Sequence, residues 1–221
     1  KIGSGECNNF AVLEAAAIYK KPMIISTGMN TIDSCQETYD FVKNKIGNNI
    51  ILMHTTNLYP TPFHLVRLGG MIELGNISGE YIGLSDHTIN NLASLGSIAM
   101  GAVLIERHFT DTKDREGPDI INSMTPSELK ELKESSLLMF KMRGGSKQNK
   151  IPEEDGVRDF AFATIVATKN INKGEYFSKS NTWPKRPGFG EIPAYDHSLI
   201  IGKKASKDIK KDLHISLKDV D

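Results

Sequence analysis

The chain has 221 residues, of which 39% are hydrophobic and 24% are charged, and its 27 Lys and Arg balance its 27 Asp and Glu. A chain of this length builds one large domain or two smaller ones, and a net charge of zero argues against nucleic acid as a partner. Two cysteines are too few for a disulfide framework and match no zinc motif, so we expect a cytoplasmic protein. No apolar run approaches the ~18 residues of a membrane span, so we expect no membrane partner.

Residues 1–125 alternate short apolar runs with longer amphipathic stretches. The apolar runs predict strands at 23–26, 50–53, 81–84 and 103–105. The amphipathic stretches predict helices at 10–19, 34–45 and 90–100, the second opening with a capping box of Ser34 and Glu37. Strand starts recur about every 20–30 residues, which is the period of a βα unit in a parallel sheet. The fold class is therefore α/β.

A further helix is predicted to begin after Thr125, which caps it together with Glu128, while Pro126 occupies the first turn. This helix is predicted to end near Gly144. The polar residues 146–157 predict a linker, and the residues after it predict short strands and turns, with a first strand at 160–167. We therefore expect a domain at 1–145, a linker at 146–157 and a small second domain at 158–221.

The number of βα units limits the architecture of the first domain. A closed (β/α)8 barrel needs about 250 residues, but residues 1–145 supply four complete units and, at Lys1, what looks like the end of an earlier strand. Four units cannot close an eight-stranded barrel. The domain is either an open sheet or the C-terminal portion of a barrel whose upstream half is missing.

Polar residues follow each of the four predicted strands, at 26–28, 54–57, 85–88 and 106–108. In parallel α/β folds, ligands bind at the carboxyl ends of the strands, so four such clusters in succession predict one shared site. The alternative is that these residues only begin surface loops. The charged loop at 111–119 is open to the same two interpretations, a solvated loop or a substrate contact.

His87 and His108 are the candidate metal ligands, because neighbouring strand ends can aim two imidazoles at one ion. Two histidines suit an open octahedral site in which water and substrate oxygens complete the shell of Mn²⁺ or Mg²⁺. The alternative is that one or both are hydrogen-bonded core histidines, and the spacing favours neither interpretation.

Several side chains are suited to holding a phosphate or a carboxylate, with one lysine as a point charge and the others as hydrogen-bond donors. They are Lys1, Ser4, Ser26, Asn57 and Ser85. The glycine-rich stretches match neither a P-loop nor a dinucleotide fingerprint, so nucleotide binding is not expected.

Eight motifs in the chain resemble the sialic acid synthase family, the enzymes that condense phosphoenolpyruvate with N-acetylmannosamine. They are KIGSGECNN at 1–9, STGMN at 26–30, HTTNLYPTP at 54–62, RLGGM at 67–71, GLSDHT at 83–88, ERHFTD at 106–111, GPDI at 117–120 and KRPG at 185–188. The resemblance implies the C-terminal portion of a (β/α)8 TIM barrel, from the end of strand four to strand eight, followed by a small antifreeze-like (SAF, β-clip) domain. We therefore expect this fragment to be inactive alone.

The resemblance also implies a role for each candidate residue. It makes His87 and His108 the ligands of a divalent metal, Mn²⁺ in the first place and Mg²⁺ or Co²⁺ as alternatives. It assigns phosphoenolpyruvate to Lys1, Ser4, Ser26, Asn57 and Ser85. It assigns the amino sugar to Tyr59, Glu106, Asp119 and Arg186, the last of these reaching the N-acetyl group from the partner subunit of a domain-swapped homodimer. Glu6 is an implied catalytic carboxylate, with its role open between positioning and proton transfer.

The expected activity is therefore that of an N-acetylneuraminate synthase, in which C3 of phosphoenolpyruvate attacks the metal-polarised aldehyde of open-chain N-acetylmannosamine. Water then captures the cationic C2, and phosphate leaves. The nearest alternative is the same chemistry on a diacetamido-trideoxyhexose, giving legionaminic acid. Two others are a different TIM-barrel metalloenzyme, indicated by three or more protein ligands, and a non-enzymatic ice- or sugar-binding module, which the lysines near the C-terminus disfavour.

Overall fold

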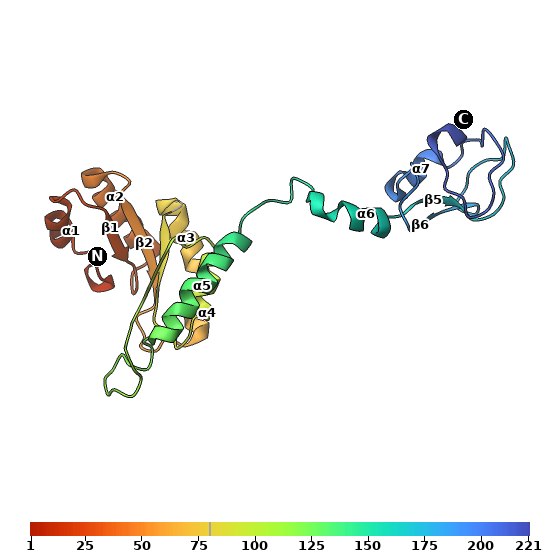
Figure 1. Cartoon of the computed structure of the whole chain (residues 1–221). Helices are drawn as coiled ribbons and strands as arrows, with labels where there is room; N and C mark the ends of the chain where they lie inside the picture. The colour runs from red at the N-terminus through yellow and green to blue at the C-terminus, as the bar shows by residue number, and fades with distance from the viewer. Residues whose placement is uncertain (80) are drawn as a thin grey trace. The chain divides into compact units, whose positions relative to one another are not determined.

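The computed structural model describes residues 1–79 and 81–221. These residues form two compact units, Lys1–Gly145 and Ser146–Asp221, each with a hydrophobic core of its own (Figure 1). None of the helices in the described part of the chain is both long enough and apolar enough to cross a membrane.

The first unit is built on a parallel sheet whose four strands lie side by side in chain order. They are β1 (Met23–Ser26), β2 (Ile50–Thr55), β3 (Ile82–Asp86) and β4 (Leu104–Arg107). All four predicted strands are confirmed, and the last three each continue two residues further, into the polar segments that follow. Beyond β1, Ile2 forms a parallel bridge to Ile25 and extends the sheet toward the start of the chain.

Five helices alternate with these strands: α1 (Phe10–Ala17), α2 (Ile32–Ile46), α3 (Gly69–Ser78), α4 (Leu92–Ala99) and α5 (Pro126–Met142). The main core joins helix residues such as Leu13 and Met71 to strand residues such as Ile25 and Leu52. Because side chains alternate along a strand, the residues between these core positions face the other side of the sheet. The unit is thus a curled half-barrel with its helices outside, which confirms the α/β class and the expected partial TIM barrel.

Helices α2 and α3 differ most from the sequence prediction. Helix α2 begins at Ile32, two residues before the predicted start, because Thr31 rather than Ser34 is the N-cap and its Oγ1 accepts the Ser34 N–H at 3.3 Å. Helix α3 was not predicted, since a Gly-Gly pair at its start lowers helix propensity. The second glycine of the pair has a packing reason, because a Cβ on Gly70 would lie 2.8 Å from the His54 ring. By contrast, the capping box of Thr125 and Glu128 is confirmed.

The second unit is a small domain of short elements around a core of isoleucines and Phe177. It contains α6 (Asp155–Ala161), the antiparallel strands β5 (Thr164–Ala167) and β6 (Thr182–Lys185), and α7 (His197–Ile200). The predicted strand at 160–167 is wrong in its first part, because Phe160 and Ala161 end α6 and pairing begins only at Thr164. Helix α6 also begins inside the stretch predicted to be a linker.

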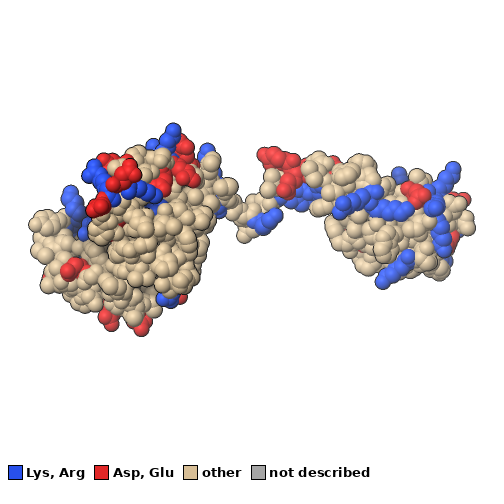
Figure 2. Space-filling model, turned by 90° about the horizontal axis from the view of Figure 1, so that it is seen from below, with Lys and Arg blue, Asp and Glu red and all other residues tan. Residues whose placement is uncertain are grey.

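Short 3-10 turns complete both units, at Ser4–Glu6, Phe63–Leu65, Pro152–Glu154, Ala194–Asp196 and Leu217–Asp219. On the face drawn in Figure 2, charges of both signs intermingle on the first unit, while Lys and Arg are the more prominent on the second. The five lysines at 203, 204, 207, 210 and 211 are all exposed. They therefore form a solvated face, as the sequence indicated.

Asp219 is a buried carboxylate that links two segments of the second unit. It is 4% exposed, its Oδ1 lies 2.7 Å from Lys207 Nζ, and its Oδ2 accepts the Ser216 N–H at 3.0 Å. Burial by itself raises the pKa of Asp219, but the hydrogen bonds from Lys207 and Ser216 outweigh it and hold the pKa below its usual value. Because the pKa of Asp219 is lower in the folded than in the unfolded protein, the ionised carboxylate stabilises the fold at pH values above the unfolded pKa of about 3.9.

We predict that Asp219→Asn lowers the stability of the second unit at pH 7 by about 1–3 kcal/mol, because the paired charge is lost. The difference from the unchanged protein should shrink as the pH falls from about 4, where Asp219 of the unfolded chain is protonated, toward the lower pKa of the folded state. Calorimetric unfolding across this pH range measures both effects. Asp212→Asn, which removes an exposed carboxylate paired with Lys185, is the control and should have little effect; equal losses from both variants would contradict the prediction.

Candidate active site

The parallel register brings a serine and a glutamate from neighbouring strands into contact. Ser85 on β3 is the register partner of Glu106 on β4, and its Oγ donates to Glu106 Oε1 at 2.9 Å. Lys1 Nζ lies 2.9 Å from each oxygen of the same carboxylate. Burial raises the pKa of Glu106, but the hydrogen bonds from Lys1 and Ser85 outweigh it, so its pKa lies below the usual value. The carboxylate is therefore ionised at neutral pH, and it is bound by a lysine and a hydroxyl.

The two candidate metal ligands also lie close together. His87 follows the last residue of β3 and His108 follows the last residue of β4, and their ring centroids are 5.3 Å apart at 77°. The Tyr59 ring lies 4.2 Å from the ring of His87 and 5.6 Å from that of His108. Burial and the charges of Asp119 and Glu106 raise the pKa of Tyr59 above its usual value, so the phenol keeps its proton.

Each histidine has a partner that orients its ring. His87 is 6% exposed, and its Nδ1 lies 2.9 Å from the carbonyl oxygen of Thr56, so Nδ1 is the protonated donor and Nε2 keeps its lone pair. Burial lowers the pKa of His87, which favours the neutral ring. His108 Nδ1 lies 3.6 Å from Asp119 Oδ2. A carbonyl or carboxylate behind each imidazole is the usual outer shell of a metal-binding histidine.

The loop after β4 folds back along the strand end and carries Asp119 to His108. Met124 N donates to the carbonyl of His108 at 2.8 Å, and Thr110 N donates to that of Met124, also at 2.8 Å. The outer part of the loop is solvated, where Asp111 and Arg115 form an exposed ion pair. The outer end of the loop is therefore a solvated surface, while its other end brings Asp119 beside His108.

A second group of predicted anion-binding residues meets at the loop after β1. Gly28 N donates to Ser4 Oγ at 3.1 Å, and Asn30 Nδ2 donates to the carbonyl of Ser4, also at 3.1 Å. Asn57 packs against Gly28 so closely that a Cβ on this glycine would lie 1.8 Å from Asn57 Oδ1. That oxygen is buried and has no hydrogen-bond partner among the described residues.

The other residues predicted for the site, Ser26, Glu6 and Arg186, are not part of the two groups of contacts described above. Ser26 is buried at the end of β1, and Glu6 is exposed in the 3-10 turn before α1, where its Oε2 accepts the Asn9 Nδ2 hydrogen at 2.5 Å. Arg186 is exposed in the second unit, directly after β6. Gly28 belongs to the predicted strand-end cluster at 26–28 but had no predicted role, and Asn30 was not predicted, although the position of STGMN directly after a strand was the signal that pointed to both.

A cavity of about 670 Å³ adjoins Asn57, between the loops after β1 and β2 and helix α3. Thr27, Asn30 and Arg67 are among the residues that line it. It provides room beside the predicted anion-binding residues.

The donor set fits a divalent ion bound by two imidazoles. In the described part of the chain, no group of three or more His, Cys, Asp or Glu residues is arranged to hold an ion. Two imidazole ligands leave the other positions to oxygen ligands, as Mn²⁺ or Mg²⁺ allows. His87 and His108 are the residues that would hold the ion.

The chain belongs to the NeuB family, whose model matches residues 1–148, and a SAF domain model matches residues 162–221. It is 37% identical to the N,N'-diacetyllegionaminic acid synthase of Campylobacter jejuni, over 96% of this chain and 64% of that protein. It is 30% identical to the human N-acetylneuraminate-9-phosphate synthase, over 96% of this chain and 59% of that protein. These matches confirm the resemblance to sialic acid synthases.

Among solved structures, the spore coat polysaccharide biosynthesis protein SpsE of Bacillus subtilis is similar, with a TM-score of 0.60 and 30% identity. The match covers 99% of this chain and 66% of SpsE. This chain thus spans about 60–66% of the length of the relatives compared.

We predict that Gly28→Ala weakens binding of phosphoenolpyruvate, because the added methyl group displaces Asn57 and crowds Ser4. The cost of overpacking is about 1–3 kcal/mol. The shift in melting temperature on adding phosphoenolpyruvate to the complete protein measures the effect. Gly156→Ala, where a Cβ meets no atom within 4 Å, is the matched control, and an unchanged shift in Gly28→Ala would show that Asn57 does not bind this ligand.

Proposed function

We propose that the complete protein is a nonulosonic acid synthase, which joins phosphoenolpyruvate to the open-chain aldehyde of an N-acetylated amino sugar and releases phosphate. The main support is the arrangement of Lys1, Ser85 and Glu106 with the histidine pair at adjacent strand ends. In a barrel of this kind, the carboxyl ends of the strands carry the active site.

Phosphoenolpyruvate is the proposed ligand of Lys1, Ser4, Ser26, Asn57 and Ser85. Lys1 and Ser85 both bind a carboxylate here, that of Glu106, so they suit the carboxylate or phosphate oxygens of this substrate. One lysine and several neutral donors neutralise and orient the substrate without a nucleophile from the protein.

His87 and His108 are the proposed ligands of a divalent ion, Mn²⁺ first, with Mg²⁺ or Co²⁺ as alternatives. When bound, the ion acts as a Lewis acid toward the aldehyde oxygen of the sugar. His87 stays neutral because it is buried, and Thr56 holds its ring. Asp119 lies behind His108 and also contributes to the sugar pocket in this proposal.

The reaction forms one carbon–carbon bond and one carbon–oxygen bond, from water, and breaks the carbon–oxygen bond between C2 and phosphate. C3 of phosphoenolpyruvate attacks the aldehyde carbon, and the aldehyde oxygen takes up a proton. Water adds to C2 and loses a proton, which balances the one taken up. The tetrahedral intermediate then expels phosphate, the hydroxyl proton on C2 passes to the leaving phosphate, and C2 becomes the ketone of a 2-keto acid. The proposed role of Glu106 is to stabilise positive charge at C2 with its ionised carboxylate, and Glu6 either positions the sugar or transfers a proton.

Tyr59, Glu106, Asp119 and Arg186 are the proposed contacts of the sugar. N-acetylmannosamine is the acceptor expected from the sequence. The Campylobacter relative, at 37% identity, favours a diacetamido-trideoxyhexose as a second candidate. The two sugars differ around C4 and C6, away from the phosphoenolpyruvate groups.

Release of phosphate from phosphoenolpyruvate, measured with each sugar and Mn²⁺ in the complete protein, separates the two acceptors. Activity with either sugar supports a synthase and identifies its preferred acceptor. Inactivity with both would contradict the proposed function.

We predict that His87→Ala and His108→Ala in the complete protein each lower turnover by more than about 100-fold and abolish its dependence on Mn²⁺. The reason is that each variant removes one of the two metal ligands proposed in this chain. Circular dichroism checks that the fold is retained, and His64→Ala, an exposed histidine of the same unit, is the control. Full activity in either site variant would remove that residue from the metal site.

We also propose that the complete protein is a cytoplasmic, domain-swapped homodimer in which Arg186 of one subunit reaches the N-acetyl group of the sugar bound by the other. We predict that Arg186→Ala raises the KM for the sugar about tenfold, the usual cost of losing a charge-assisted hydrogen bond, and leaves the KM for phosphoenolpyruvate nearly unchanged. Steady-state kinetics with each substrate varied in turn measures both constants. An effect on phosphoenolpyruvate alone would contradict the assignment.

A further inference from the structure

Asp86 and Arg107 form a buried ion pair directly before the two histidines. They are register partners on β3 and β4, with side chains 0% and 2% exposed and Arg107 Nε 3.6 Å from Asp86 Oδ2. Because side chains alternate along a strand, this pair faces the helices, while His87 and His108 face the site. The pair therefore lies behind the proposed metal ligands.

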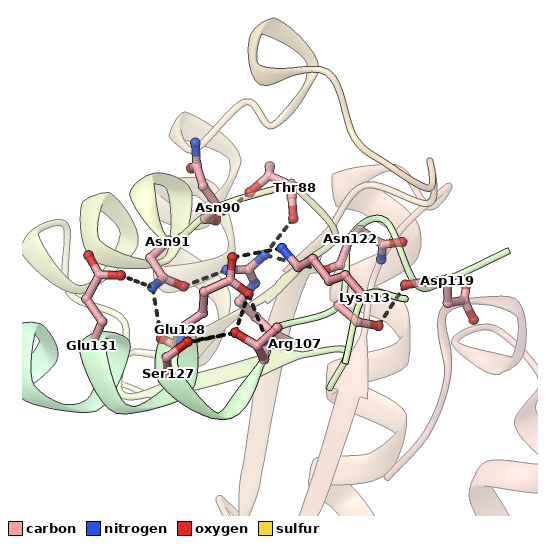
Figure 3. Close-up of polar contacts among 12 residues, drawn as sticks. Thr88, Asn90, Asn91, Arg107, Lys113, Asp119, Asn122, Ser127, Glu128 and Glu131 are labelled. Atoms are coloured by element: carbon pink, nitrogen blue, oxygen red, sulfur yellow. Dashed lines mark hydrogen bonds and ion pairs between the residues drawn. The ribbon is translucent and has the colours of Figure 1, made fainter. Parts of the chain in front are cut away.

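The guanidinium group of Arg107 hydrogen-bonds to the backbone of the segment that carries His87. Its Nη2 donates to the carbonyl of Thr88 at 2.5 Å (Figure 3). The N–H of the same residue, Thr88, donates to Asp86 Oδ1 at 2.8 Å. Both backbone polar groups of the residue after His87 are thus hydrogen-bonded to the ion pair.

Arg107 also connects this segment to the elements around it. Its Nη1 donates to Asn91 Oδ1 at 2.6 Å, at the start of α4, and its Nη2 lies 3.5 Å from the carbonyl oxygen of Asn122 (Figure 3). Asn122 belongs to the returning loop that pairs with His108 two residues later, through Met124. The Arg107 side chain therefore contacts the backbone of Thr88, next to His87, and that of Asn122, in the loop whose Met124 pairs with His108.

Lysine in place of Arg107 would keep the positive charge but not this set of contacts. A guanidinium group offers five donors in a rigid plane, and an ammonium group is a single point of charge on a flexible chain. A buried ion pair adds little net stability over apolar residues, so the position of this pair between the strands of the two histidines suits a role other than stability. One such role is that of an outer-shell partner, which orients the ligands of a metal ion.

We propose that Arg107 is a positioning residue whose guanidinium group sets the spacing of His87 and His108 and thereby the affinity for a divalent ion. It contacts neither the ion nor the substrates. The inference rests on the proposed function, because the histidine pair is a metal site only under that proposal.

The test is the affinity of the complete protein for Mn²⁺ alone, measured at constant pH from the electron paramagnetic resonance signal of the free ion. Arg107→Lys should raise the Kd for Mn²⁺ by about 10-fold to 100-fold, the usual effect of losing an outer-shell partner. Arg115→Lys, the same change at an exposed arginine of the first unit, should alter it less than twofold. At saturating Mn²⁺, the Arg107→Lys variant should regain most of the kcat of the unchanged protein. Substitution of a residue that contacts the substrate would lower kcat even at saturating Mn²⁺.

Asn91→Ala decides the question if Arg107→Lys does not fold, because it removes one acceptor of Arg107 and leaves the ion pair with Asp86 in place. It should weaken Mn²⁺ binding severalfold. If the folded variants bind Mn²⁺ as the unchanged protein does, while His87→Ala does not bind it, the role of Arg107 is refuted and the metal site stands. If the unchanged protein does not bind Mn²⁺, the metal site fails, and the role of Arg107 fails with it.

Discussion

The parallel register of β2, β3 and β4 is the constraint on which the candidate site depends. It pairs Thr55 with Ser85 and Ser85 with Glu106, so polar residues from successive strands form one row on the side of the sheet away from the helices. A shift of one residue in any strand would turn its row toward the helices, because the side-chain period is two. The apolar core on the helix side therefore also determines which residues face the site.

Opposite charges meet in close contacts at the candidate site, although the net charge of the chain is zero. Lys1 and Glu106 are 105 residues apart in sequence, and Lys1 Nζ lies 2.9 Å from Glu106 Oε1. Such a pair, together with two imidazoles, suits an anionic substrate and a cation in the same site. A broad basic surface is not needed for this, since a few placed donors are enough to bind a phosphate or a carboxylate.

The polar pair of Asp86 and Arg107 interrupts the otherwise apolar side of the sheet that faces the helices. Its charges are almost fully buried, but Asp86 also accepts hydrogen bonds from Thr88 N and Ser94 Oγ, which offset part of the cost of burial. Polar contacts thus hold the ends of the strands, whereas apolar packing holds their middles. These polar contacts keep the strand ends in place and thereby define the geometry of the site.

The sequence by itself determined the α/β class, the four strands and the residue types at the strand ends, because hydrophobic period and strand spacing are local properties. It did not reveal α3, where Gly70 is explained by the close approach of His54, or the N-cap role of Thr31 in α2. Only the tertiary structure decided that Glu106 binds Lys1 and Ser85, that Asp119 lies beside His108, and that Arg107 binds the backbone next to His87 and the loop that pairs with His108. These contacts join residues from different strands and loops, and their distances depend on register and packing, which no local pattern specifies.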